Sequence, residues 1–295
     1  MRVAVLTSGS VTTPGWHVAD LARAAAQLSV TLNVCHWRHL QSSVSEAGLT
    51  AMAGETPLHE MDVLLLRTMP AGSLEQIVLR MDIAGRLAAS GVKVINSPRA
   101  VEMAVDKYLA LASMAQVGLP TPRTVACQRY EDAMQAFEQM GSDVVVKPLF
   151  GSEGFGIQRL TDPDLAGRTF AHLAQLNAVI YLQQYIDHEG QDFRLFVLGG
   201  KVIAAMRRTH SSDWRTNISR GATGQPHEPT PRQVELALKA AAACDAMVAG
   251  VDILLDRQGR HWVIEVNAVP GWRELSRVTQ IDVASLLLKE ALACA

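Results

Sequence analysis

The stretch GVDILLDRQGRHWVIEVNAVPGW, residues 250–272, predicts two strands joined by a turn and followed by a Pro-Gly break. Gln258 and Gly259 supply the turn, because a polar residue followed by glycine between apolar runs is typical of a hairpin tip. Counting back from this tip places Asp252 directly opposite Glu265. Like charges that face each other destabilise a strand pair, so these two carboxylates need a further partner.

Alternation along the second strand adds a third polar group. Side chains point to opposite faces in turn, so Asn267 is expected on the face of Glu265 and Ile264 on the other face. Asp252, Glu265 and Asn267 would together suit Mg²⁺, which takes one or two carboxylates and completes its shell with water and phosphate oxygens. Arginine or lysine from elsewhere, with the register slipped by one residue, would satisfy the carboxylates equally well, and the hairpin alone does not decide between the two.

Length and composition indicate a globular protein with two or three compact units. The chain has 295 residues, of which 48% are hydrophobic and 19% charged, enough for sizeable cores. A formal net charge of −2 gives no electrostatic reason to expect nucleic acid or an anionic membrane as a partner. No apolar run reaches membrane-spanning length, and the N-terminus turns polar too early for a signal peptide. We therefore expect a cytoplasmic protein with neither partner.

The cysteines and histidines suggest no metal or nucleophile chemistry of their own. The four cysteines, Cys35, Cys127, Cys244 and Cys294, are scattered without CxxC spacing, which predicts reduced thiols and no zinc site. None of the nine histidines has metal-ligand spacing or belongs to a convincing triad. All of them are therefore expected to be structural.

Strand and helix patterns alternate through the first hundred residues. Strands are expected at 2–7, 31–37, 62–68 and 92–97, and helices at 17–28 and 73–90. This βαβ rhythm predicts a small, mostly parallel sheet covered by helices. The first turn, TSGSVTTPGW (7–16), lacks the GxGxxG pattern, so a dinucleotide site is not expected there.

From Pro98 onward the pattern changes to helices and antiparallel strands. One helix is expected from Pro98 to a stop at Gly118, with prolines beyond it. Further helices are expected at 129–141, 166–176, 231–247 and 282–294, and strands at 143–148 and 178–186. The segments 192–208 and 250–269 are expected to form hairpins.

A glycine-rich stretch, KPLFGSEGFGI (147–157), follows the expected strand 143–148. Gly151, Gly154 and Gly156 allow close backbone approach, so the backbone N–H groups could wrap phosphate oxygens. It is not a Walker A loop, because no GK[ST] follows. Lys147, at the end of the strand, could meet phosphate charge there. Lys107 is a second candidate, although a solvated helix lysine is the simpler interpretation of its sequence context.

The hairpin DFRLFVLGGKVIAAMRR (192–208) carries further charge. With its two central glycines as the tip, Asp192 faces Arg207 across the strands. A cross-strand ion pair is one interpretation. Because Arg194 shares the same face, a cationic surface directed at phosphate is the other.

The polar segment THSSDWRTNISRGATG (209–224) follows this hairpin. It contains Arg215, Asn217 and Arg220 but shows no regular period. A long polar loop in a compact domain is more often functional or disordered than structural. Trp214, like Trp272, could be part of a core or of a pocket wall, and the core is the safer expectation.

The order of these features resembles the ATP-grasp enzymes, and specifically the RimK-type amino-acid ligases. The motifs that carry the resemblance are DK (106–107), VVVKP (144–148), GSEGFG (151–156), LQQYI (182–186), DFR (192–194), MRR (206–208), WRTNISRG (214–221), VDIL (251–254) and EVNAVPGW (265–272). The resemblance covers essentially the whole chain. It implies an α/β fold with a small N-terminal parallel α/β domain (1–97) and two α+β ATP-grasp subdomains (98–186 and 187–295).

The resemblance also implies a role for each candidate residue. Lys107, Lys147, Arg215 and Asn217 would meet ATP phosphates, with the loop of Gly151, Ser152, Gly154 and Gly156 folded over them. Gln184 and Tyr185 would line the adenine, and Asp192 would hold the ribose. Arg207 and Arg220 would meet the γ-phosphate, the acyl phosphate or a substrate carboxylate. Asp252, Glu265 and Asn267 would hold two Mg²⁺ ions, with Mn²⁺ as a substitute. The family commonly has Glu where this chain has Gln184, which would reverse the polarity of any side-chain bond to adenine.

The activity implied is an ATP-dependent ligation of a carboxylate to an amine through an acyl phosphate. The chain looks most like the members that add L-glutamate to tetrahydromethanopterin, so L-glutamate and a small carboxylate acceptor such as a pterin cofactor are the expected substrates, in a homo-oligomeric enzyme. Ligases that act on a ribosomal protein or on a carrier-protein amino acid are the close alternatives. A phosphotransferase on the same scaffold and a nucleotide-binding module without turnover are alternatives of other classes.

Overall fold

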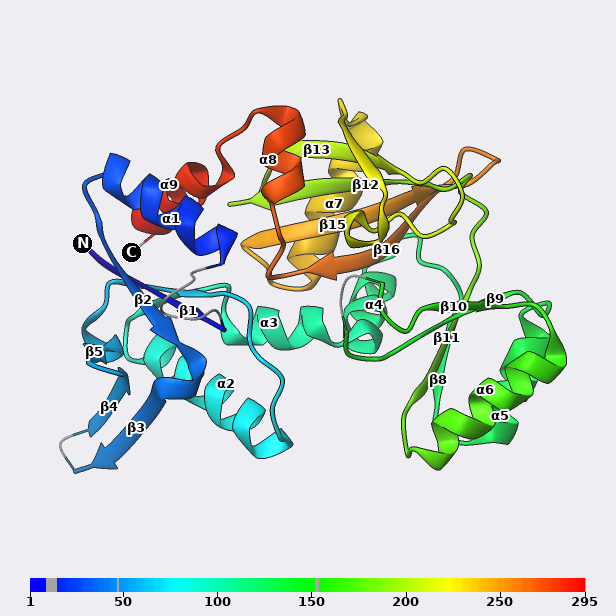
Figure 1. Ribbon diagram of the computed structural model, residues 1–295, viewed down its shortest axis with the longest axis horizontal. Coiled ribbons are helices and arrows are strands. Elements are labelled where there is room, and N and C mark those ends of the chain that lie inside the picture. Colours follow the sequence, from blue (N-terminus) through cyan, green and yellow to red (C-terminus); the bar gives the residue numbers. More distant parts are fainter. Residues whose placement is uncertain (9–14, 47, 152–153, 295) are drawn as a thin grey trace.

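A parallel four-stranded sheet forms the N-terminal part of the computed structural model, which describes residues 1–8, 15–46, 48–151 and 154–294 (Figure 1). Its strands, in the order β2-β1-β6-β7, are β1 (Arg2–Thr7), β2 (Thr31–His36), β6 (Val63–Leu66) and β7 (Lys93–Ile95), and its helices are α1 (Trp16–Gln27) and α2 (Leu74–Ala89). Val3 and Val5 enter one core while Ala4 and Leu6 enter another. Both faces of β1 are therefore buried, as its continuous apolar sequence requires.

A second, antiparallel sheet between β2 and β6 was not expected from the sequence. Its elements are η1 (Trp37–His39), β3 (Leu40–Ser45), β4 (Gly48–Ala53), β5 (Thr56–Pro57) and η2 (Leu58–Glu60). Most side chains of β3 are exposed. A strand that buries so little has almost no apolar alternation to reveal it.

The single helix expected from Pro98 to Gly118 is wrong, because the chain forms two helices, α3 (Pro98–Val105) and α4 (Lys107–Gln116). Asp106 separates them with an extended backbone and caps α4 by accepting hydrogen bonds from the N–H groups of Tyr108 and Leu109. Such a cap needs non-helical dihedrals at the capping residue. The break makes Lys107 the first residue of α4.

The central antiparallel sheet carries the glycine-rich loop between two of its strands. Its strands, in the order β10-β9-β11-β8, are β8 (Thr124–Cys127), β9 (Val144–Lys147), β10 (Gln158–Leu160) and β11 (Ile180–Gln184). Two helices, α5 (Tyr130–Gln139) and α6 (Pro163–Gln175), pack together beside it (Figure 1). Because their core takes one face of the sheet, the opposite face is left for the site.

The C-terminal sheet is also antiparallel and has the order β14-β13-β12-β15-β16. Its elements are β12 (Gln191–Leu198), β13 (Lys201–Thr209), η3 (Ile218–Arg220), β14 (Thr223–Pro226), α7 (Pro231–Ala243), β15 (Val248–Leu255), β16 (His261–Asn267), α8 (Arg273–Thr279) and α9 (Val283–Ala293). Helix α7 covers one face, and α9 lies beside α1 of the N-terminal part (Figure 1).

The hairpin β15–β16 pairs Asp252 with Glu265, as the sequence predicts. The tip is longer than expected, and a bulge at Ile264 restores the expected pairing. The bulge changes which side chains share a face. Val263 and Val266 both lie in the core, whereas Ile264 and Glu265 both face the cavity described below. The expected strict alternation along this strand is therefore wrong.

The hairpin β12–β13 also contains a bulge, between Phe196 and Val197. It shifts the pairing by one residue, so Asp192 lies opposite Arg208. The expected pairing of Asp192 with Arg207 is wrong for this reason. One extra residue on one strand moves every later side chain of that strand to the other face.

The N-terminal part and the C-terminal sheet share one core. Strand β1 and helix α1 pack with β12, β13, α8 and α9. The side chain of Asn96 accepts a hydrogen bond from the N–H of Val248 and donates to the carbonyls of Val248 and Ala268 at 2.8, 2.6 and 2.5 Å. Trp272, 1% exposed, donates to Asp20 at 3.1 Å. The division into domains at 97 and 186 remains a prediction.

Among the helices in the described part of the chain, none is both long and apolar enough to cross a membrane.

Candidate active site

A cavity that is open to solvent lies between the central and C-terminal sheets. The candidate residues brought together in its wall are Lys107, Lys147, Gln184, Tyr185, Asp192, Arg215, Asn217, Asp252 and Glu265. Residues more than 150 positions apart in the sequence thus meet in one site.

Other candidates lie outside the wall of the cavity. Gly151, Gly154 and Gly156 belong to the adjoining loop, and Ser152 lies outside the described residues. Asn267 and Arg220 lie nearby without lining the cavity, whereas Arg207 is exposed and donates to Gln225 at 2.6 Å. The adjacent Arg208 lines the cavity instead, as the bulge in β12–β13 dictates.

Lys147 projects from the end of β9 into the cavity. Its Nζ donates to Oε1 of Gln183 at 2.7 Å, and Nε2 of Gln183 donates to Oγ1 of Thr124 at 3.0 Å. Burial and the charge of Lys107 together lower the pKa of Lys147 to about 8, against the opposing charge of Glu265. Keeping the ammonium group charged therefore costs free energy, and an anionic ligand bound beside it would reduce that cost.

Lys107 also reaches the cavity, so the interpretation of it as a solvated helix lysine is wrong. Its Nζ donates to the carbonyl of Gly151 at 2.7 Å, at the start of the glycine-rich loop. Burial lowers its pKa, while the charge of Glu265 opposes this shift. The break at Asp106 gives the physical reason, because it directs the first turn of α4 toward the loop.

Three buried charged residues and the partly buried Arg194 form a network across β12, β13 and β15. Arg194 binds Asp252 with two hydrogen bonds, Nε to Oδ1 at 2.7 Å and Nη2 to Oδ2 at 2.6 Å. Arg208 also binds Asp192 in a bidentate manner, and its Nη2 lies 2.9 Å from Oδ2 of Asp252. Burial opposes the ionisation of Asp252, but the two arginines hold its pKa below the ordinary value. A cross-strand ion pair of Asp192 therefore forms, with Arg208 in place of the expected Arg207, and Asp192 also lines the cavity.

The three expected metal ligands differ in how free they are. Among the described residues, none forms a hydrogen bond or ion pair with the carboxylate of Glu265, which lines the cavity. Oδ1 of Asn267 accepts from the N–H of Val269 at 2.8 Å and retains a second lone pair. Asp252 is ion-paired with two arginines. Within the described ranges, no three His, Cys, Asp or Glu residues are grouped to hold a metal. Glu265 and Asn267 are the residues that could bind Mg²⁺ with the fewest changes. Asp252 could bind the ion only after giving up its ion pair with one of its arginines.

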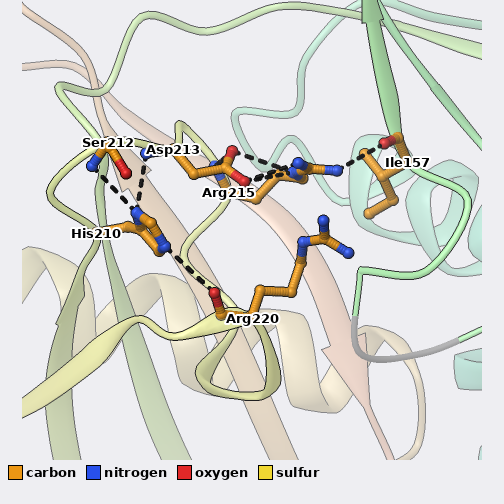
Figure 2. A network of polar contacts seen from close by, with 6 residues as sticks. All are labelled: Ile157, His210, Ser212, Asp213, Arg215 and Arg220. Atoms are coloured by element: carbon orange, nitrogen blue, oxygen red, sulfur yellow. Dashed lines mark hydrogen bonds and ion pairs between the residues drawn. The ribbon is translucent and has the colours of Figure 1, made fainter.

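The polar segment 209–224 packs against the glycine-rich loop. Arg215 is held by Asp213 through Nε at 3.0 Å and Nη2 at 2.7 Å, and its Nη1 donates to the carbonyl of Ile157 at 3.3 Å (Figure 2). A Cβ on Gly154 would lie 2.4 Å from Oδ1 of Asn217 and 3.2 Å from Cδ of Arg220. Glycine is therefore required where the two loops meet.

Aromatic rings form one wall of the cavity. The rings of Tyr185 and Trp214 meet edge to face at 5.8 Å, and the guanidinium of Arg159 lies 3.5 Å from the centre of the Tyr185 ring. Trp214 lines the cavity, so the expectation of a core position is wrong for it and right for Trp272.

Several lining residues were missed from the sequence, namely Tyr181, Gln183, His188, Arg208 and Thr216. Tyr181 and Gln183 lie two residues apart on β11 and therefore on the same face of the strand. The alternation of side chains along a strand could have predicted that they point to the same side. His188, Arg208 and Thr216 carried no local signal, because loop geometry and a bulge determine where they point.

A family model for the RimK-like ATP-grasp domain matches residues 104–291. The tetrahydromethanopterin:alpha-L-glutamate ligase of Methanosarcina acetivorans is 37% identical over 227 residues, which cover 73% of this chain and 70% of that protein. The ribosomal protein bS6--L-glutamate ligase of Escherichia coli is 34% identical over 198 residues, 66% of each chain.

Two solved structures share the fold over nearly the whole chain. A RimK domain ATP-grasp protein from Sphaerobacter thermophilus has a TM-score of 0.76 and 24% identity, covering 99% of this chain and 100% of that one. The ATP-grasp ligase PsnB, solved with a phosphomimetic variant of its minimal precursor, Mg and ADP, has a TM-score of 0.76 and 20% identity, covering 99% and 98%.

Proposed function

Since this chain belongs to the RimK-like ATP-grasp family, we propose that it adds L-glutamate to a carboxylate acceptor in an ATP-dependent ligation. One observation carries the proposal. Two lysines and the carboxylate of Glu265 meet in a cavity between the two ATP-grasp sheets. Such a combination suits a polyphosphate bound through a divalent cation. PsnB, which has the same fold, binds Mg and ADP.

The nucleotide would lie with its phosphates toward the glycine-rich loop. Lys107, Lys147 and Arg215 supply positive charge at that end of the cavity. Gln184 ends β11 of the central sheet and Tyr185 follows it, and we assign both residues to the adenine. Asp192 is assigned to the ribose, where its ion pair with Arg208 fixes the carboxylate in place.

Mg²⁺ would be held by Glu265 and Asn267, with Asp252 available once Arg194 is displaced. A bound divalent cation would neutralise charge that develops on the transferred phosphoryl group. The binding of two ions, and the use of Mn²⁺ in their place, belong to the same proposal.

The chemistry we propose has two steps. An oxygen of the acceptor carboxylate attacks the γ-phosphorus of ATP, and the bond to ADP breaks, giving an acyl phosphate. The nitrogen of glutamate then attacks the acyl carbon, phosphate leaves, and the amine releases its proton. The site residues position charge and exclude water, which is the main contribution a protein makes to phosphoryl transfer.

For the acceptor we propose a small carboxylate such as a pterin cofactor. The support is the similarity to the tetrahydromethanopterin ligase, which has the higher identity of the two relatives described above. The near-neutral formal charge of −2 agrees with a small acceptor better than with a strongly charged carrier protein. A protein acceptor such as the one named for the Escherichia coli relative is the alternative that the experiment separates.

The test is a ligation assay with ATP, Mg²⁺, radiolabelled L-glutamate and a panel of pterin, peptide and protein carboxylates. We expect ADP and a glutamyl amide, and a hydroxamate when hydroxylamine replaces glutamate. A stable phosphoester without any hydroxamate would instead show a phosphotransferase. Nucleotide binding without turnover on any acceptor of the panel would contradict the ligase proposal.

A further inference from the structure

His210 follows β13 and forms three hydrogen bonds through its ring (Figure 2). Nδ1 accepts from the N–H of Ser212 at 3.2 Å and from the N–H of Asp213 at 2.8 Å. A nitrogen that accepts two N–H groups carries no proton, so the ring proton lies on Nε2. Nε2 therefore donates to the carbonyl of Arg220 at 3.2 Å. The ring is neutral and in a single tautomer.

The Nδ1 side of the ring leads to Arg215. It fixes the backbone of Asp213, whose carboxylate accepts from the backbone N–H of Arg215 at 2.9 Å and from its guanidinium at 2.7 Å. Arg215 in turn donates to Ile157 and lines the cavity. We call this series of contacts the Arg215 arm.

The Nε2 side leads to Arg220. It holds the carbonyl of Arg220, at the end of η3, and the following Gly221 has φ = +96°. Among the described residues, Nε of Arg220 is buried and has no hydrogen-bond partner. Its side chain lies against Gly154 and points toward Arg215 (Figure 2). We call this second series the Arg220 arm.

We propose that His210 is a positioning residue that sets both loop arginines against the glycine-rich loop. His210 does not line the cavity and acts through the two arms. It is the only ring among the described residues that bonds to both the Asp213–Arg215 turn and the Arg220 backbone. The inference rests on the proposed function only for the identity of the ligand, a nucleotide phosphate. No local pattern predicted this role, since the residue has neither metal-ligand nor triad spacing.

The two arms can be separated by substitution. Asparagine at this position can accept from N–H groups two and three residues ahead, as in an Asx turn. His210→Asn therefore preserves the Arg215 arm and loses the Arg220 arm. Glutamine places an amide donor further along the side chain, so His210→Gln preserves the Arg220 arm and loses the other. His210→Ala loses both.

The experiment measures kcat and KM for ATP in the ligation assay for these three variants. The Arg215 arm reaches the wall where ATP phosphates bind, so we expect His210→Gln to raise KM for ATP about fivefold with kcat little changed. The Arg220 arm serves the transferred group, so His210→Asn should lower kcat about fivefold with KM little changed. His210→Ala should show both defects. Wild-type kinetics in His210→Ala, or the same defect in all three variants, would overturn the proposal.

A matched control and a measurement independent of turnover complete the test. His59 also holds backbone through its ring, at Ala51 in the N-terminal part, and His59→Ala should leave both kinetic constants unchanged. Nitrogen-15 NMR of labelled histidine, with His210→Gln to assign the signal, should show a neutral ring protonated at Nε2. A ring protonated at Nδ1 would overturn the inference whatever the kinetic constants of the variants.

This design distinguishes the inference from the function it rests on. An inactive wild-type protein on every acceptor would refute the proposed function, while the NMR result would still decide the tautomer of His210. An active wild-type enzyme with unaffected His210 variants would refute the inference alone.

Discussion

At the scale of single residues, a positive charge in the wall of the cavity lowers the stability of the protein when no ligand is bound. Lys147 is partly buried and has no ion pair among the described residues, and its burial lowers its pKa from 10.5 to about 8. The unfolded chain keeps this proton up to about pH 10.5. Stability should therefore rise with pH between about 8 and 10.5, because the unfolded state binds more protons over that range.

The first prediction follows for Lys147→Met. At pH 7 the substitution removes the cost of the buried charge and one hydrogen bond, so the free energy of unfolding should rise by about 2 kcal/mol. ATP binding should be lost. Denaturant unfolding at pH 7 and pH 10.5 tests this, since the gain should vanish at the higher pH. Lys239→Met, at an exposed lysine paired with Glu235 on α7, is the control and should show no such pH dependence.

Asp252 and Glu265 face each other, yet removing one carboxylate should leave the stability unchanged, whereas removing the other should lower it. Glu265→Ala deletes a carboxylate that no described residue binds, so we expect an intact fold and loss of ADP formation. Asp252→Ala leaves Arg194 without its counter-charge and leaves the buried Arg208 with Asp192 as its only carboxylate partner, and it should cost about 3–5 kcal/mol of stability. Thermal unfolding beside the ADP assay measures both effects. Equal destabilisation by the two variants would contradict this assignment.

At the scale of elements, two bulges decide which side chains face the cavity. The bulge in β12–β13 places Arg208 inside and Arg207 outside, and the bulge at Ile264 turns Glu265 toward the cavity. Each bulge shifts the ladder by one residue, which is enough to exchange a buried cation for an exposed one.

Adjacent arginines give a matched pair for testing this register. Arg208→Ala should destabilise the protein by about 3–5 kcal/mol and abolish turnover, because it leaves Asp192 and part of Asp252 buried without their cation. Arg207→Ala removes an exposed side chain bonded to Gln225 and should change stability by less than about 0.5 kcal/mol. Urea unfolding and ligation kinetics measure both. Comparable losses in the two variants would indicate the unshifted register.

At the scale of the whole molecule, the N-terminal part and the C-terminal sheet are joined by a shared core and by Asn96. Its side chain satisfies the N–H and carbonyl of Val248 and the carbonyl of Ala268, all far from it in sequence. Buried backbone groups of this kind need partners, so Asn96 couples the two parts energetically.

Asn96→Ala should therefore lower the free energy of unfolding by about 3 kcal/mol and weaken the coupling between the two parts. Chemical denaturation, followed together with proteolysis of the N-terminal part, is the measurement. Asn33→Ala is the control, since Asn33 bonds to Val3 within the N-terminal sheet and should cost about 1 kcal/mol without uncoupling. An equal, cooperative loss in both variants would show that Asn96 has no bridging role.

The sequence by itself determined the order of the main strands and helices (not β3–β5 or the division of α3 from α4), the pairing of Asp252 with Glu265 and the residues that carry the family resemblance. These follow from local periodicity and turn chemistry, which act over a few residues. Only the tertiary structure decided the break at Asp106 that brings Lys107 to the loop, the bulge that exchanges Arg207 for Arg208, and the position of His210 between two arginines. Each of these depends on contacts between distant segments, and neither hydrophobic alternation nor turn composition records such contacts.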